Sequence, residues 1–139
     1  MQILVLGMHR SGTSVVTQLL AAAGAHVGSN DDLMAAMPDN PQGYWERLDI
    51  ARINQDILNA CGVDWFSATG DDVSAMAPAS RNRLAAAVRQ VVHSMNFHRP
   101  WVTKDPRLSL TVPLWSPLLE APFFVVCHRH PGEVAYSLR

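Results

Sequence analysis

The sequence predicts an α/β domain of three layers, in which a short parallel sheet is flanked by helices. Short apolar runs near residues 2–6, 100–103 and 123–127 suit buried strands of a parallel sheet. Between them lie longer segments whose apolar residues recur at helical spacing, as expected where strands alternate with helices. With 139 residues, of which 48% are hydrophobic, the chain is expected to form one domain over residues 1–139.

The first predicted strand continues through a loop bounded by Gly7 and Gly12 into a helix that Gly24 would close. Such a turn leaves backbone N–H groups without helical partners and directs them, with the helix dipole, at one point. Phosphate or sulfate fits at such a point. We therefore predict an anion site formed by His9, Arg10, Ser11, Gly12, Thr13 and Ser14.

The spacing of Gly7, Gly12 and Ser14 matches the P-loop pattern GxxxxGK[ST], except that Thr13 replaces the lysine. An ATP or GTP site uses that lysine on the β- and γ-phosphates, so its loss weakens an NTPase interpretation. Arg10 supplies a cation within the loop instead. A P-loop nucleotide kinase or NTPase, or a non-catalytic nucleotide-binding fragment, remains an alternative on the same P-loop-like fold.

Composition argues against several classes of partner. The formal net charge of −1 gives no basis for binding nucleic acid or an anionic membrane. Cys61 and Cys127 form neither a disulfide framework nor a metal-ligand spacing. The N-terminal apolar run is too short for a signal peptide, and no window reaches membrane-spanning length. We expect a cytoplasmic protein, and the sequence carries no signal for an oligomeric state.

Residues 25–42 are rich in turn formers and predict a surface loop, with one helical turn at residues 33–37. Tyr44, Trp45 and Glu46 then precede a helix whose apolar stripe runs from Ile50 to Leu58. Desolvation beside the two aromatic residues would raise the pKa of Glu46, which suits a general base. A first-turn glutamate that only complements the helix dipole explains Glu46 equally well.

In the second half of the chain, residues 63–77 predict a loop and Pro78 begins a helix that is apolar along one face. The prolines within residues 109–122 exclude one unbroken helix there. Residues 123–127 form the clearest buried strand after the first. Lys104, the only lysine, and Arg129 follow the second and third strands, at the edge where parallel sheets bind ligands.

Three motifs together resemble the sulfotransferases that use 3′-phosphoadenosine 5′-phosphosulfate (PAPS). Their phosphosulfate loop has a lysine or arginine, here Arg10, before a [ST]GT[ST] run, here residues 11–14. The Lys-Asp-Pro segment at Lys104 resembles tyrosylprotein and carbohydrate sulfotransferases. In the family's second motif an arginine ends a strand, and a proline and a serine follow two and eight residues later. Here these are Arg129, Pro131 and Ser137, with His130 in place of the usual asparagine.

The resemblance implies transfer of a sulfuryl group from PAPS to a hydroxyl or amine of a small-molecule or carbohydrate acceptor, with adenosine 3′,5′-bisphosphate as product. Arg10 and the loop amides would hold the 5′-phosphosulfate, and Arg129 and Ser137 the 3′-phosphate. No metal is required in this scheme, because a sulfuryl group carries less charge than a phosphoryl group and arginine with lysine can replace magnesium. Family members continue past the second motif, so the C-terminal part of the family fold is expected to be missing here.

The catalytic residues implied by the resemblance are Glu46, Lys104 and Arg10. Lys104 would neutralise the equatorial sulfate oxygens, as a cationic clamp does in phosphoryl transfer. Glu46, or a loop histidine such as His9, would accept the proton of the acceptor. The alternative for Lys104 is a surface lysine at a proline turn, with Asp105 pairing with Arg107.

Overall fold

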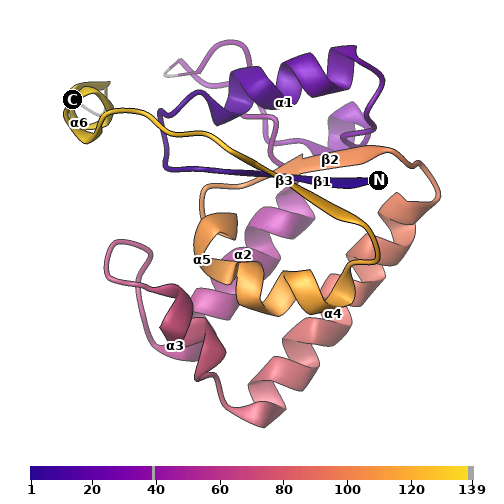
Figure 1. Cartoon of the computed structure of the whole chain (residues 1–139), viewed down its shortest axis with the longest axis vertical. Coiled ribbons are helices and arrows are strands. Elements are labelled where there is room, and N and C mark those ends of the chain that lie inside the picture. Colours follow the sequence, from indigo (N-terminus) through magenta and orange to yellow (C-terminus); the bar gives the residue numbers. More distant parts are fainter. Residues whose placement is uncertain (39, 138–139) are drawn as a thin grey trace.

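Three parallel strands form the centre of the molecule in the computed structural model, which describes residues 1–38 and 40–137 (Figure 1). β1 (Gln2–Leu6) lies between β2 (Trp101–Lys104) and β3 (Pro122–Val126). Leu4 is in register with Thr103 of β2 and with Phe124 of β3. Because the strands are parallel, their C-terminal ends meet at one edge of the sheet.

Helices cover both faces of this sheet (Figure 1). α1 (Thr13–Ala22) lies on one face, and α2 (Leu48–Cys61), α4 (Pro78–Asn96) and α5 (Leu108–Trp115) lie on the other. Side chains of β1 alternate between the two faces, as successive residues of a strand must. Ile3 and Val5 belong to the smaller core under α1, and Leu4 belongs to the larger core on the opposite face. The predicted α/β class and the burial of β1 on both faces are confirmed.

The two long helices follow the predicted apolar stripes. α2 buries Ile50, Ile57 and Leu58, and it ends where Gly62 adopts a left-handed φ of 70°. α4 begins at Pro78, whose missing N–H costs nothing in the first turn. Its buried face includes Val88. Both helices pack on α5 and enclose the larger core.

The segment predicted as a loop at residues 63–77 contains a short helix, α3 (Gly70–Ser74). Thr69 and Asp72 form a capping box, in which the Thr69 N–H donates to Asp72 Oδ2 over 2.7 Å. The same small and acidic residues that suggested a loop are therefore a helix N-terminus. We missed α3 because turn formers and capping residues are the same residue types.

The predicted surface loop at residues 25–42 also differs in detail. Its helical turn is a 3-10 turn at η1 (Asn30–Asp32), not at residues 33–37. Leu33 and Met37 instead form isolated bridges with Arg47 and Asn40. Asp39, which falls within this predicted loop, lies outside the described residues.

The proline-rich segment contains a broken helix, as predicted. α5 continues through Pro113 to Trp115, and the break comes at the 3-10 turn η2 (Ser116–Leu118). Pro117 lies in the first turn of η2, where a missing N–H is tolerated.

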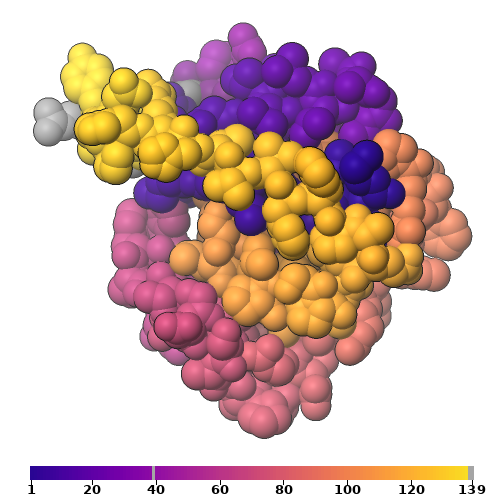
Figure 2. All heavy atoms as spheres, viewed as in Figure 1, coloured from indigo at the N-terminus to yellow at the C-terminus, as the bar shows by residue number. Residues whose placement is uncertain are grey.

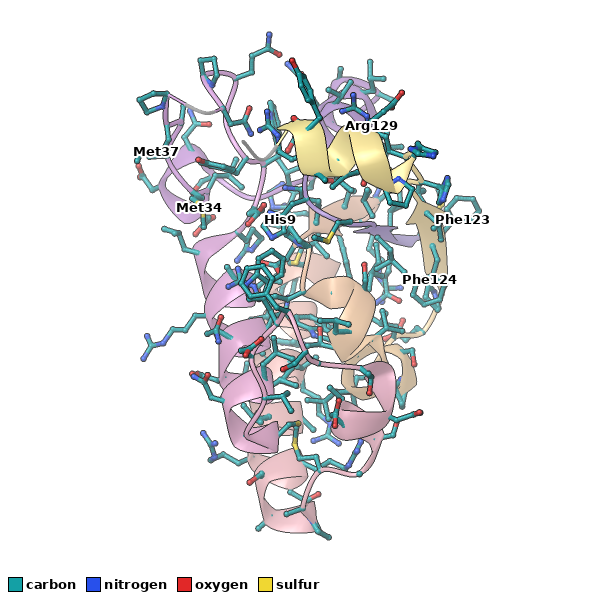
Figure 3. The ribbon with its side chains drawn as sticks, turned by 90° about the vertical axis from the view of Figure 1, so that its left-hand side faces the viewer. His9, Met34, Met37, Phe123, Phe124 and Arg129 are labelled. Carbon is teal, nitrogen blue, oxygen red and sulfur yellow. The ribbon has the colours of Figure 1, made fainter. Side chains whose placement is uncertain are left out.

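β3 is not a buried strand, which corrects the sequence prediction. It lies at the edge of the sheet, and Phe123, Phe124 and Val126 are 56%, 40% and 71% exposed. Figure 2 shows β3 crossing the surface of the molecule, and Figure 3 shows Phe123 and Phe124 at that surface. The chain then passes into α6 (Pro131–Ser137), which stands out from the rest of the fold in Figures 1 and 2. An apolar run identifies a strand, but it does not tell a central strand from an edge strand.

Candidate active site

The C-terminal ends of the three strands open onto a cavity of about 300 Å³. This volume is within the range of small-molecule sites. The cavity walls come from the β1–α1 loop, the segment before α2, the end of β2, and the segment from β3 into α6. The predicted site residues that line it are His9, Arg10, Gly12, Thr13, Ser14, Glu46, Lys104, Arg129 and Ser137.

Glycine is required at the start of the β1–α1 loop. A Cβ on Gly7 would lie 2.6 Å from the carbonyl oxygen of Cys127, because the continuation of β1 passes directly against the end of β3. The Gly7 N–H donates to Ser109 Oγ over 3.0 Å. Gly12, with φ of 87°, immediately precedes α1 and needs the left-handed region that glycine adopts without strain.

Ser11 is the predicted site residue that lies outside the cavity. Its N–H donates to the Met8 carbonyl oxygen over 3.2 Å, which closes a tight turn within the loop. The turn directs Ser11 to a neighbouring apolar hollow that Cys127 and Val134 also line. The Ser11 amide is therefore bonded within the loop and does not face the anion position that the sequence suggested.

Arg10, Arg129 and Ser137 meet across the cavity although they are far apart in sequence. Arg10 Nε donates to Ser137 Oγ over 2.9 Å, and Arg129 Nη1 donates to the Arg10 carbonyl oxygen over 3.0 Å. The Glu133 carboxylate accepts a hydrogen bond from Arg129 Nε at 3.0 Å and so orients the guanidinium group. Arg10 itself has a left-handed φ of 63°, uncommon for a residue with a side chain. Figure 3 shows Arg129 at α6, with His9 on the neighbouring loop.

Lys104 and Glu46 form a buried ion pair at the base of the cavity. The Lys104 ammonium donates to Glu46 Oε1, and both side chains are almost inaccessible to solvent. Lys104 Nζ also donates to the Tyr44 carbonyl oxygen over 3.0 Å. Two residues that are 58 positions apart in the sequence are thus brought into direct contact, with opposite charges on one wall of the cavity.

The Tyr44 carbonyl oxygen is a site feature that sequence reasoning missed. It accepts from Lys104 Nζ and also from Ser14 Oγ, at 3.1 Å. The next residue, Trp45, has a left-handed φ of 59°. This turn of the backbone allows both the Tyr44 carbonyl and the Glu46 carboxylate to face Lys104. A backbone oxygen leaves no signal in a pattern of side chains, so the sequence could not reveal it.

Two titratable groups on the cavity wall have shifted pKa values. Burial raises the pKa of Glu46, and the adjacent Lys104 opposes that rise. Burial lowers the pKa of His9, and the positive charge of Lys104 lowers it further. Both effects favour the neutral imidazole of His9. A buried carboxylate of raised pKa and a neutral imidazole are both able to accept a proton.

Asp105 and Arg107, which follow Lys104 in the chain, form a hydrogen-bonded ion pair. The fully buried Asp105 carboxylate accepts from the Arg107 backbone N–H at 2.8 Å and from its Nε and Nη2 at 2.9 and 2.7 Å. Arg107 Nη1 also donates to Gln55 of α2 over 3.2 Å. These bonds fix the turn that follows Lys104. Pairing of Asp105 with Arg107 was part of the surface-lysine alternative, but here it accompanies a buried Lys104.

Within residues 1–38 and 40–137, no three His, Cys, Asp or Glu side chains are grouped so that they could hold a metal ion. No helix in these parts of the chain is long and apolar enough to span a membrane. The cavity-lining residues that sequence analysis had not assigned to the site are Val15, Asn40, Tyr44 and Pro106.

Comparison with known proteins gives one positive result. A family model described as the sulfotransferase family matches residues 2–139. A search of curated proteins and a search of solved structures each found no match. The family match covers essentially the whole chain, including the segments that line the cavity. This chain belongs to the sulfotransferase family.

Proposed function

We propose that the protein transfers a sulfuryl group from PAPS to a hydroxyl or amine of an acceptor molecule. The observation that carries this proposal is the meeting of Arg10, Arg129 and Ser137 with Lys104 and Glu46 on one cavity. The first three provide cationic and hydroxyl groups for a nucleotide with two separate anionic ends. The other two provide a cation for the group that is transferred and a base for the acceptor proton.

The donor would lie across the β1–α1 loop and the start of α6. Arg10 and the loop amides would bind the 5′-phosphosulfate, and Arg129 with Ser137 would bind the 3′-phosphate. Guanidinium groups suit this task because they form strong, charge-assisted bonds to phosphate oxygens. In the free protein these side chains bond to one another, so the donor would replace protein oxygens with its own.

In the proposed reaction the acceptor oxygen or nitrogen attacks the sulfur atom and forms the new bond to it. The bond between sulfur and the bridging oxygen of the 5′-phosphate breaks, and the electron pair leaves with adenosine 3′,5′-bisphosphate. The acceptor proton passes to Glu46. Arg10 stabilises the charge that grows on the leaving phosphate, and Lys104 stabilises the equatorial sulfate oxygens.

The buried Lys104–Glu46 pair links donor binding to this proton transfer. Without donor, the Lys104 charge stabilises the Glu46 carboxylate and so limits its rise in pKa. When sulfate oxygens draw the ammonium away, the carboxylate loses that stabilisation and becomes a stronger base. The base would therefore be strongest when the sulfuryl group is in place.

Three features favour sulfuryl transfer over phosphoryl transfer from ATP. Thr13 stands where the P-loop lysine would contact the β- and γ-phosphates. Ser14, whose hydroxyl would be a magnesium ligand in an NTPase, instead donates to the Tyr44 carbonyl. The wall opposite the loop carries the ammonium of Lys104 rather than an isolated acidic magnesium ligand.

Calorimetry tests the donor. We expect adenosine 3′,5′-bisphosphate to bind more tightly than ATP with magnesium, because only the former has a 3′-phosphate for Arg129 and Ser137. Transfer of radiolabelled sulfate from PAPS to a panel of alcohols and amines tests the reaction, with Glu46→Gln as the variant that lacks the base. Tighter binding of ATP with magnesium, or equal transfer by Glu46→Gln, would contradict the proposal.

A further inference from the structure

Beside the cavity, three aromatic rings form a continuous run from the cavity wall to the surface. His9 lines the cavity, and its ring lies edge-on to Trp65 with the ring centroids 4.3 Å apart. Trp65 in turn contacts Phe66, also at 4.3 Å between centroids. The Phe66 ring is 80% exposed. Figure 1 shows the α2–α3 loop, which carries Trp65 and Phe66, on the same side of the molecule as the β1–α1 loop and α6.

The α2–α3 loop holds these rings on a fixed backbone. Asp64 Oδ1 accepts from the N–H groups of Phe66 and Ser67, at 2.8 and 3.0 Å. The Asp64 carbonyl oxygen accepts from Ser67 and from the Ala68 N–H at 2.9 Å. Trp65 packs against the larger hydrophobic core and anchors the loop from below. Phe66 is thus presented to solvent by an ordered turn, at the cost of leaving a large apolar surface in water.

We propose that Trp65 and Phe66 form the acceptor subsite, and that the acceptor carries an aromatic ring beside its reactive hydroxyl. This inference rests on the proposed function, because it assigns the substrate class of the same site. The acceptor ring would stack on the two side chains, and its hydroxyl would enter the cavity past His9 toward Lys104 and Glu46. Aromatic pairs are stabilised beyond simple burial by the geometry of their ring quadrupoles.

The polar groups of the loop distinguish an aromatic acceptor from a sugar. Asp64 Oδ1 and the Ser67 N–H and hydroxyl are already hydrogen-bonded within the loop. A sugar ring needs partners for several hydroxyl groups, and burying them without partners is unfavourable. An aromatic ring needs only the faces that Trp65 and Phe66 offer. His9, whose burial lowers its pKa, lies edge-on to Trp65 and extends this aromatic wall to the cavity.

A matched pair of acceptors and a matched pair of variants test this subsite. The probes are 2-naphthol and its saturated twin, decahydro-2-naphthol, which have the same carbon skeleton and hydroxyl position but differ in aromaticity. The variants are Phe66→Ala and the control Phe97→Ala. Phe97 is also a highly exposed phenylalanine, 74%, and its ring also contacts a histidine, His93. It follows α4, near the opposite edge of the sheet, because β2 begins just after it.

Binding of each probe is measured by saturation-transfer NMR, with and without bound adenosine 3′,5′-bisphosphate, and turnover is measured with PAPS. We expect 2-naphthol to bind more tightly than decahydro-2-naphthol. We expect Phe66→Ala to weaken 2-naphthol binding and raise its KM about fivefold, the range for one aromatic contact, with kcat little changed. Phe97→Ala should leave both values unchanged, and Phe66→Tyr should restore them.

The outcomes separate this inference from the function it rests on. If the bisphosphate binds and PAPS is used, but Phe66→Ala binds 2-naphthol as well as the wild type does, the aromatic subsite is wrong and sulfuryl transfer stands. Equal binding of the two probes, or preferential transfer to a methyl hexopyranoside, would overturn the aromatic class. If the bisphosphate does not bind, the proposed function fails and this inference fails with it.

Discussion

Replacing Lys104 with methionine isolates the contribution of the buried ion pair. Methionine keeps the unbranched apolar stem, so the change removes the charge without opening a large cavity. Glu46 would then be a buried carboxylate without its counter-ion, since Lys104 is its charged hydrogen-bond partner. Removing one partner of a buried pair costs about 3–5 kcal/mol. In a domain of ordinary stability, about 5–15 kcal/mol, this is a large share of the whole.

The loss in Lys104→Met should depend on pH in a defined direction. Burial raises the pKa of Glu46 in the folded protein, and removal of Lys104 raises it further. A raised pKa contributes stability below the unfolded-state pKa, and that stability is lost as pH rises through the folded-state pKa. The deficit relative to the wild type should therefore be smaller at pH 5 than at pH 7. The double variant Lys104→Met with Glu46→Gln, which has no stranded charge, should recover about half of the loss or more.

Urea unfolding at pH 5 and pH 7 measures these differences from the transition midpoints and slopes. Arg83→Met, an exposed charge-to-methionine change on α4, is the control and should stay within about 0.5 kcal/mol of the wild type. A deficit for Lys104→Met below about 1 kcal/mol, outside the range for a buried pair, would refute the reasoning. An equal deficit at both pH values would show that Glu46 is not the stranded group.

Three further outcomes follow from particular contacts. Arg129→Ala should weaken the binding of adenosine 3′,5′-bisphosphate about tenfold or more in calorimetry, since a hydrogen bond to a charged group contributes about 1.5–3 kcal/mol. The same change should weaken the binding of AMP, which lacks the 3′-phosphate, much less. Equal losses of affinity for the two nucleotides would contradict the role of Arg129 at the 3′-phosphate. In thermal unfolding, Gly7→Ala should be more destabilising than Gly12→Ala, because the new Cβ would lie 2.6 Å from a backbone oxygen at Gly7 but meets nothing within 4 Å at Gly12; the reverse order would contradict the close approach. Thr69→Ala should cost about 1 kcal/mol in urea unfolding through loss of the α3 cap, and an unchanged midpoint would show that the cap is unimportant.

Much of the fold was predictable because its signals are local. Hydrophobic pattern and turn residues predict the strand, the glycine-bounded loop and the helix at Leu4 to Leu20. They also predict α4 from Pro78 onward. Strand order is not local. Whether residues 123–127 lie at the centre or the edge depends on what pairs with them, so the apolar run at Phe123 suggested burial that the sheet does not provide.

In the candidate site, too, residue types were predictable from local sequence, but the contacts between the residues were not. Side-chain types and their position after strands led to Arg10, Lys104, Glu46 and Arg129, and all four line one cavity. Their mutual contacts were not predictable, because the Lys104–Glu46 pair depends on the left-handed backbone at Trp45. The departure of Ser11 from the cavity has the same origin, since a turn closed by its own N–H reorients it. Backbone conformation inside loops is the information that a residue pattern lacks.

The hydrogen bonds among Arg10, Arg129 and Ser137 have a practical meaning for protein engineering. They brace the β1–α1 loop against α6 and the residues that lead into it. A chimera that exchanges only one of them with another family member would lose the brace together with the nucleotide contacts. To transfer the proposed donor-binding residues to another protein, both segments would have to be exchanged together, although more than a hundred residues of chain separate them.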